Sequence, residues 1–292
     1  MRSKFRGTGV ALITPFNDDL SVDYDSLERL VDYCTAGGVD YLVVNGTTSE
    51  ASTLESEEKF DILEFICEKN TEKLPIMYGV GANNTNYVIE LIERTNLSGV
   101  DALLTVSPYY NKPSQEGIFQ HYCAVANVSP VPVLLYNVPG RTGINISAKT
   151  TLRLAEHHNI FGIKDASGDM IQCLKILKDK PNDFLVISGD DMMTVPMISV
   201  GAEGVISVIA NAYPKTYSTA ITNALEGDFK SAGKVTQNFV HLNEYLYKES
   251  NPVGIKEVLV QKGLCKGNVR LPLVKASEKL RNNIAETMIA GA

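Results

Sequence analysis

The chain has 292 residues, 44% of them hydrophobic, and is therefore long enough to bury a large core. Its 27 Lys and Arg residues stand against 34 Asp and Glu residues, which gives a formal net charge of −7. The sequence contains no dense basic run, and this argues against a nucleic-acid-binding protein.

The sequence indicates neither export nor membrane insertion. Residues 1–5 lead directly into a strand-like segment, without the apolar region of a signal peptide. No apolar run approaches the roughly 20 residues that a membrane helix requires. The five cysteines are scattered, odd in number and without CxxC spacing, which is atypical of disulfide or zinc frameworks. We therefore expect a protein of the reducing cytoplasm, without a membrane partner.

Eight short apolar segments rich in β-branched residues recur along the chain, and their nearly continuous apolar character is typical of parallel strands buried on both faces. A helical segment follows each of the first seven, beginning with residues 22–37, for which Ser21 is the predicted cap. Strict alternation of strand and helix indicates a parallel α/β fold. The predicted strands are residues 9–15, 41–45, 75–79, 101–106, 131–136, 161–164, 184–188 and 204–208. The helices between them are residues 22–37, 56–70, 86–97, 114–128, 147–158, 169–178 and 192–200.

Eight evenly spaced units predict a closed (β/α)8 TIM barrel rather than an open sheet. An open dinucleotide-binding sheet carries GxGxxG after an early strand, whereas the nearest match, residues 79–84, lacks the third glycine. We predict that the barrel covers residues 1–225 and that a C-terminal helical extension, residues 226–292, packs on it. Helical periodicity after the last strand marks residues 212–227, 229–247, 252–262 and 272–290.

In such barrels the catalytic groups come from the C-terminal ends of the strands. Here those ends are rich in hydroxyl groups, and all four histidines fall in predicted helices instead. No cluster of His, Asp and Glu points to a catalytic metal. No serine has an evident histidine partner for triad hydrolysis.

A single lysine, Lys164, lies inside the apolar segment 161–164. Lysines at strand ends commonly extend their ammonium group to solvent, but the strands of a closed barrel have no edge. Burial disfavours the ammonium form and leaves a nucleophilic amine, and such an amine condenses with carbonyl compounds to form a Schiff base. Lys164 is therefore the candidate nucleophile.

Hydroxyl side chains end or follow several other strands. Tyr136 ends the strand before Lys164, Tyr110 follows the strand before that, and Thr47 and Thr48 follow the second strand. Schiff-base chemistry needs a proton carrier, and a tyrosine can serve as one. Taken singly, Tyr136 also fits a core aromatic, and the threonines fit a turn or a helix cap. Their occurrence together at strand ends favours a hydroxyl relay.

Three further residues are candidates for substrate binding. Arg141, shortly after Tyr136, is suited to clamp a carboxylate through two hydrogen bonds, and a surface salt bridge is the alternative. Gly189 and the backbone near Ile206 leave room for a small anion to approach closely.

Four motifs at these strand ends resemble the dihydrodipicolinate synthase (4-hydroxy-tetrahydrodipicolinate synthase) family. This family belongs to the pyruvate-dependent class I aldolases, a group that includes N-acetylneuraminate lyase. The similarity runs in order from Gly7 to about Pro272. The motifs are GTTSE at 46–50, TVSPYYNKP at 105–113, YNVPGRTG at 136–143 and GIKDAS at 162–167.

The resemblance implies a lyase that needs no cofactor, because Lys164 itself binds pyruvate as a Schiff base. The enamine then attacks L-aspartate 4-semialdehyde, and the adduct cyclises to 4-hydroxy-tetrahydrodipicolinate, a step of lysine and diaminopimelate biosynthesis. By motif match, Tyr136 relays protons, with Thr48 and Tyr110 as its partners.

The same resemblance implies binding roles and an assembly. Arg141 matches the arginine that orients the carboxylate of the aldehyde. Thr47, Thr48 and Ile206 match positions that contact pyruvate. The tyrosine that matches Tyr110 is shared across a tight-dimer interface, which implies a homo-oligomer, either a dimer or a tetramer.

The chain departs from the family's pattern at several positions. Ser49 replaces the usual glycine of the Thr-Thr loop, a change that alters loop flexibility but removes no chemical group. Ser56 and Lys59 stand where lysine-inhibited members carry effector-site histidines, and Tyr87 replaces an acidic residue. Because a cationic Lys59 would repel the ammonium group of lysine, we expect weak or absent feedback by lysine.

Other functions stay open on the residues alone. A sister aldolase acting on N-acetylneuraminate or a 2-keto-3-deoxy sugar acid would keep Lys164 and Tyr136 and differ in its acceptor. A non-catalytic barrel that binds an oxo acid is disfavoured by the intact lysine and relay. A phosphate-binding isomerase barrel is disfavoured because Asp190 and Asp191 would face the phosphate.

Overall fold

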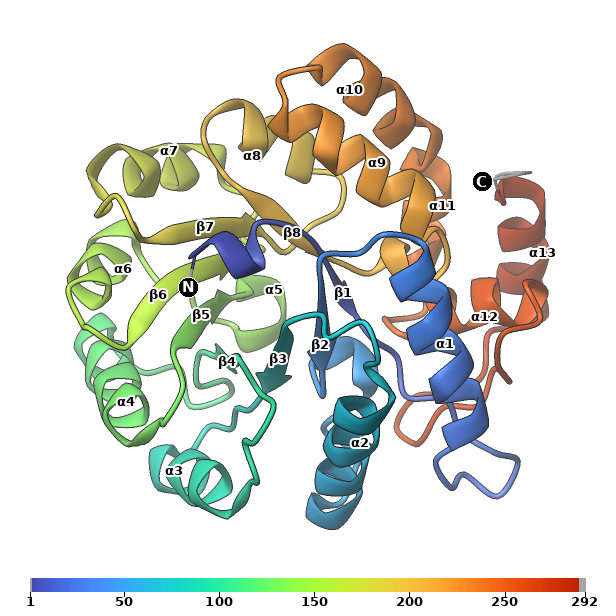
Figure 1. The fold of residues 1–292 in the computed structure, drawn as a ribbon, viewed down its shortest axis with the longest axis horizontal. Helices are drawn as coiled ribbons and strands as arrows, with labels where there is room; N and C mark the ends of the chain where they lie inside the picture. The colour runs from blue at the N-terminus through green and yellow to red at the C-terminus, as the bar shows by residue number, and fades with distance from the viewer. Residues whose placement is uncertain (1, 289–292) are drawn as a thin grey trace.

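The structure, a computed structural model, describes residues 2–288. Its eight strands form one closed barrel in which every neighbouring pair is parallel and β8 pairs with β1 (Figure 1). The predicted (β/α)8 barrel is confirmed. The strands are β1 (Gly7–Ala11), β2 (Tyr41–Val44), β3 (Ile76–Gly79), β4 (Ala102–Val106), β5 (Val133–Asn137), β6 (Ile160–Asp165), β7 (Leu185–Ser188) and β8 (Gly204–Ser207).

Helices surround the barrel, as Figure 1 shows. The first of these helices begins at Tyr24, and Asp23 is its N-cap, because the Asp23 carboxylate accepts the Ser26 N–H at 3.0 Å. The cap predicted at Ser21 was therefore wrong. The helices between strands are α1 (Tyr24–Ala36), α2 (Ser56–Lys69), α3 (Thr85–Arg94), α4 (Gln115–Val128), α5 (Pro139–Thr142), α6 (Ala148–Ala155), α7 (Met170–Asp179) and α8 (Thr194–Ser199). After β8 come α9 (Pro214–Leu225), α10 (Phe229–Asn238), α11 (Val240–Lys248), α12 (Val253–Gln261) and α13 (Glu278–Thr287).

The structure corrects three helix predictions. The helix expected over 229–247 is divided at Phe239, whose buried ring packs against Tyr213 and Tyr217. The helix expected over 272–290 begins only at Glu278, because the Ser277 hydroxyl caps it there; residues 289 and 290 lie outside the described residues. The short helix α5 was not predicted, since four residues are too few to display a period.

The inside of the barrel is filled by alternate residues of its strands, as period-2 strands require. The N-terminal 3-10 helix, η1 (Arg2–Phe5), lies across one end of the barrel in Figure 1. Its Phe5 is fully buried, with the ring centre 5.2 Å from that of Tyr41. Phe5 therefore fills the end of the barrel at which the strands begin, which leaves the C-terminal ends of the strands for a ligand. The inner layer consists of Phe5, Ala11, Tyr41, Val43, Met77, Ala102, Leu104, Leu134, Tyr136, Val138, Leu185, Ile187 and Ile206.

The helices after β8 gather on the side of the barrel near β1 and α1 (Figure 1). Asn211 begins this connection: its side-chain amide donates to Ala11 O at 2.8 Å, and its Oδ1 accepts the Ile13 N–H at 3.2 Å. Helices α11, α12 and α13 pack on one another. Over residues 2–288, every helix is too short or too polar to cross a bilayer.

Candidate active site

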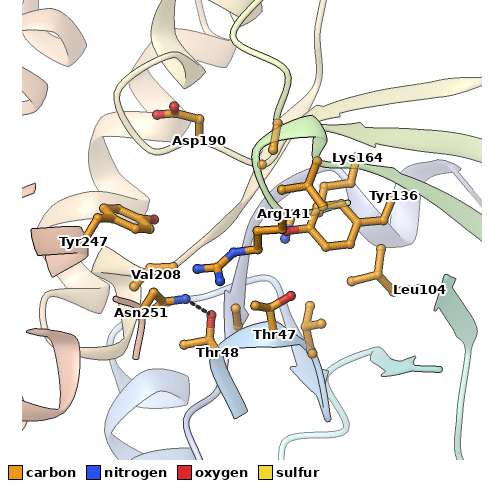
Figure 2. Close-up of a pocket in the computed structure, with 16 residues that line it drawn as sticks. Thr47, Thr48, Leu104, Tyr136, Arg141, Lys164, Asp190, Val208, Tyr247 and Asn251 are labelled. Carbon is orange, nitrogen blue, oxygen red and sulfur yellow. Dashed lines mark hydrogen bonds between the residues drawn. The ribbon is translucent and has the colours of Figure 1, made fainter. Parts of the chain in front are cut away.

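Lys164 lies at the C-terminal end of β6, in register with Tyr136 on β5 and Ile187 on β7. Residues in register on neighbouring strands share a face, and Tyr136 and Ile187 both belong to the inner layer. Lys164 is accordingly 6% exposed, and its Nζ lies 4.2 Å from the centre of the Tyr136 ring (Figure 2). The two groups that the sequence singled out for Schiff-base chemistry thus meet inside the barrel.

A pocket of about 160 Å³ opens over these two residues. Typical ligand pockets measure roughly 300–1,000 Å³, so this one suits a very small molecule. Its wall contains the predicted Thr47, Thr48, Arg141 and Gly189. It is lined by Ala11, Val43, Gly46, Thr47, Thr48, Leu104, Tyr136, Val138, Arg141, Lys164, Ala166, Gly189, Asp190, Val208, Tyr247 and Asn251.

Gly189 makes room for the lysine side chain. A Cβ added at this position would lie 2.9 Å from Lys164 Cε and 2.8 Å from Ala166 Cβ. Both distances are shorter than van der Waals contact allows. The glycine at the end of β7 therefore lets Lys164 extend across the barrel toward Tyr136.

A hydrogen-bond network fixes β5 and β6 behind the pocket. Asn137 and Asp165 follow Tyr136 and Lys164 and are themselves in register, so they point to the opposite face. The Asn137 amide donates to Asp165 Oδ1 at 3.0 Å and to Asn145 Oδ1 at 2.7 Å. Burial raises the pKa of Asp165, while hydrogen bonds from Ser167 and Asn137 oppose that rise. The network holds the reactive pair at a fixed register.

The two threonines occupy a 3-10 turn, η2 (Thr47–Ser49), directly after β2. Thr48 is 3% exposed, and its Oγ1 accepts a hydrogen bond of 3.0 Å from Asn251 Nδ2. Thr47 is exposed to the pocket, and Figure 2 places its hydroxyl on the side of Tyr136. Ser49, which replaces a glycine of the family pattern, is buried and donates to Leu12 O at 2.8 Å. Its hydroxyl therefore ties the turn to the end of β1.

Arg141 extends from the short helix α5 into the pocket in Figure 2. None of the ion pairs formed among residues 2–288 involves this side chain. The alternative of a surface salt bridge thus finds no partner in that part of the chain. A guanidinium group without a carboxylate partner, at the rim of a small pocket, is suited to bind an incoming carboxylate.

Two predicted residues do not reach the pocket of their own chain. Tyr110 is 87% exposed, with φ +73°, and lies outside the pocket lining. Ile206 is buried in the inner layer, and Val208, two residues later, provides this part of the wall instead.

Three polar side chains of the pocket were not predicted. Asp190 follows Gly189, whereas Tyr247 and Asn251 come from the end of α11 and the segment after it. Asn251 Oδ1 is buried and has no hydrogen-bond partner among the described residues. No local pattern marks Asn251, because a separation of 203 residues lies between it and the Thr48 that it contacts.

Over residues 2–288, no group of three or more His, Cys, Asp or Glu side chains has the geometry of a metal site. The polar side chains that line the pocket carry an amine, two phenols, two hydroxyl groups, a guanidinium, an amide and the carboxylate of Asp190.

Comparison with known proteins assigns the family. The model of the dihydrodipicolinate synthetase family matches residues 4–290. The 4-hydroxy-tetrahydrodipicolinate synthase of Cytophaga hutchinsonii is 55% identical over 98% of this chain and 96% of its own length. That of Parabacteroides distasonis is 48% identical, with 97% of each chain covered. The crystal structure of the chloride-inhibited dihydrodipicolinate synthase from Acinetobacter baumannii, complexed with pyruvate, superposes with a TM-score of 0.93 at 41% identity, covering 97% of each chain. The chain belongs to the dihydrodipicolinate synthetase family.

Proposed function

We propose that the protein is a 4-hydroxy-tetrahydrodipicolinate synthase, which condenses pyruvate with L-aspartate 4-semialdehyde. The observation that carries the proposal is the buried amine of Lys164, 4.2 Å from the ring centre of Tyr136 in a small pocket. The amine attacks the keto carbon of pyruvate, and loss of water gives a Schiff base. Loss of a methyl proton gives the enamine, whose carbon attacks the aldehyde carbon of the second substrate. The amino group of that substrate then attacks the imine carbon, which closes the ring and releases Lys164.

Tyr136 is the proposed proton carrier, because its phenol lies beside the amine that gains and loses protons. We propose Thr47, rather than Thr48, as the hydroxyl that links to it. Figure 2 supports this choice, since Thr47 lies on the tyrosine side of the turn while Thr48 is bonded to Asn251. Thr48 then orders the turn at the pyruvate site.

Arg141 is the proposed anchor for the carboxylate of the aldehyde substrate. Its exposed position at the pocket mouth suits the substrate that arrives second. An acceptor with a carboxylate next to an amine fits this position better than the neutral N-acetylmannosamine of the sister lyase, and this favours the synthase.

A homo-oligomer is part of the proposal, in which Tyr110 reaches the site of a neighbouring copy. A tyrosine that is 87% exposed on a strained, left-handed backbone is costly for an isolated chain. Contact with a second copy would bury its ring.

The proposed location of the protein is a reducing compartment such as the cytoplasm. The five cysteines are free, which supports this location.

We further propose that residues 1–225 form the barrel and that residues 226–292 form an extension that completes the site. Tyr247 and Asn251 support this proposal, since both line the pocket and both belong to residues 226–292. The extension then acts as a wall of the active site.

The test is reduction with borohydride in the presence of pyruvate. The wild-type protein is expected to gain the mass of one reduced pyruvate per chain, and Lys164→Ala none. Lys178→Ala, which removes an exposed lysine at the end of α7, serves as the matched control and should label fully. Turnover is then compared with aspartate semialdehyde and with N-acetylmannosamine. Labelling of Lys164→Ala, or turnover of the sugar alone, would contradict the proposal.

A further inference from the structure

Lys256 on α12 is a fully buried charged residue that the reaction does not use. Its side chain is 1% exposed, and its Nζ lies 2.5 Å from Glu50 Oε1, whose side chain is also 1% exposed. The ammonium group donates a second hydrogen bond of 2.8 Å to Asn268 O and lies 4.2 Å from the ring centre of Phe16. Three separate segments of the chain thus meet at one cation.

Glu50 is the residue that ends the turn containing the two threonines. It has a left-handed backbone, φ +57°, and its N–H bonds to Thr47 O. Its second carboxylate oxygen accepts the Arg270 N–H at 3.0 Å. Both oxygens of Glu50 are therefore bound by the C-terminal extension, from two separate points along it.

The same extension contacts the turn at a third point, where the side-chain amide of Asn251 donates a hydrogen bond to the Thr48 hydroxyl. These contacts bind Thr48 and Glu50 in the segment 46–50, three residues of which line the pocket beside Lys164 and Tyr136. The rest of the segment is held by the barrel: Ser49 donates to Leu12 O at the end of β1, and Asn45, directly before the turn, donates to Lys59 O of α2 at 3.0 Å. At Thr48 and Glu50, however, the side-chain hydrogen bonds come from the extension, which therefore helps to fix the turn relative to Lys164.

Stability is a weak explanation for such a pair. Removing two charges from water costs about as much as their attraction returns, so apolar residues of similar size often stabilise a protein equally well. A buried ion pair differs from apolar packing because it is directional. It is favourable only when the ammonium and carboxylate groups lie at one distance and orientation. That property suits a residue whose task is to place a backbone turn.

We infer that Lys256 is a positioning residue for the pyruvate half of the reaction, acting through Glu50 on the turn Thr47–Ser49. This inference rests on the proposed function. Arg141, which receives the second substrate, comes from the β5 side of the pocket and lies outside this network. Loss of the ion pair is therefore expected to affect pyruvate and to spare the aldehyde.

The test compares Lys256→Met with the double variant Glu50→Gln/Lys256→Met. In the double variant no charge is left unpaired, and the side-chain amide introduced at position 50 can donate to the freed Asn268 carbonyl, so folding is expected to recover. Misplacing a binding group by about 1 Å costs on the order of 100-fold. We accordingly expect the KM for pyruvate to rise about 10- to 100-fold in both variants, with the KM for the aldehyde within about twofold of wild type. The pyruvate concentration that half-saturates borohydride trapping should rise in parallel.

Lys266→Met is the matched control, because Lys266 forms an exposed ion pair with Asp18 between the extension and the N-terminal part of the barrel. It should leave both KM values unchanged. A purely structural role would lower the fraction of active enzyme, measured by trapping at saturating pyruvate, with neither KM altered. That result, or a pyruvate KM of the folded double variant equal to wild type, would overturn the inference. Wild-type protein that neither traps pyruvate nor turns over would instead contradict the proposed function.

Discussion

At the scale of single residues, the site depends on the small residues that pack against the Lys164 side chain as well as on the lysine itself. A buried lysine needs a wall that leaves space for its four methylene groups, and here Gly189 and Ala166 provide that wall. The lysine can then lie along the barrel with its amine beside Tyr136. A single added methyl group is enough to close this path.

Gly189→Ala is expected to lower kcat/KM by about 100-fold, because the new Cβ would displace Lys164 from Tyr136. Steady-state kinetics and the rate of borohydride trapping measure the effect. Gly233→Ala, in helix α10, is the control, since a Cβ there meets nothing within 4 Å. Its activity should be unchanged. A Gly189→Ala enzyme with the activity of wild type would contradict the proposed geometry.

His121 is a second buried residue whose environment sets its chemistry. It is 4% exposed on α4, its Nδ1 lies 2.9 Å from Thr85 Oγ1, and burial lowers its pKa from 6.5 to about 4. Below pH 6.5 the unfolded chain binds a proton at this residue, whereas the folded chain stays neutral until about pH 4. Stability must therefore fall as the pH falls through this window.

We predict that His121 alone removes about 3 kcal/mol of folding free energy between pH 6.5 and pH 4. Urea denaturation of wild type and His121→Asn at several pH values checks this. Asn keeps an acceptor for Thr85 but does not titrate. The difference between the two proteins should be flat above about pH 7 and grow in favour of the variant as the pH falls; a constant difference would refute the prediction.

At the scale of elements, the pairing of β5 with β6 sets the distance between the phenol and the amine. Tyr136 and Lys164 face the pocket, and one residue later Asn137 and Asp165 bond on the opposite face. Asn137 also accepts the Ile146 N–H at 2.9 Å, which fixes the segment before α6. A strand pair thus carries the two proposed catalytic residues on one face and their supporting hydrogen bonds on the other.

Asn137→Ala should therefore reduce both stability and activity. It leaves the Ile146 N–H and an oxygen of Asp165 without this partner, and each unsatisfied buried group costs about 1–3 kcal/mol. Urea denaturation and kcat measure the two effects. Asn127→Ala, which removes an exposed bond to His157, is expected to change stability by less than about 1 kcal/mol. Equal effects of the two substitutions would contradict a supporting role for Asn137.

At the scale of the whole molecule, the barrel and the helices that follow it share one site. The extension supplies Tyr247 and Asn251 to the pocket and holds the threonine turn through Lys256. Tyr110, by contrast, lies outside its own pocket, and in the proposed assembly it meets a second copy.

We predict little feedback inhibition by lysine. Lys59 is half-buried on α2, and Ser56 and Tyr87 accompany it where the resemblance locates the effector site. A second ammonium group near Lys59 is repelled, and the histidines that would accept it are absent from these positions. Lysine at about 1 mM, which corresponds to about −4 kcal/mol of binding, should leave the rate nearly unchanged. Strong inhibition below that concentration would refute the prediction, and Ser56→His/Lys59→His should increase sensitivity.

Much of this was present in the sequence. The eight strands, Lys164 and its neighbour Tyr136 follow from local patterns, because a buried parallel strand is apolar throughout and the functional groups of a barrel lie at the C-terminal ends of its strands. Gly189 does line the pocket, and its missing Cβ leaves room for the Lys164 side chain. Phe239 and Ser277 changed the helix boundaries because tertiary packing and capping overrule periodicity there.

Only the tertiary structure decided which residues complete the pocket. Asn251 reaches Thr48 across 203 residues and Lys256 reaches Glu50 across 206, and no local pattern encodes contacts at such separations. They arise because the helices after β8 fold back on the barrel, so that side chains from its last part stand over the turn that follows its second strand. The sequence by itself determined the barrel and the position of Lys164 at the end of a buried strand. The packing of the extension determined what surrounds this lysine, since a side chain's neighbours depend on how whole elements pack.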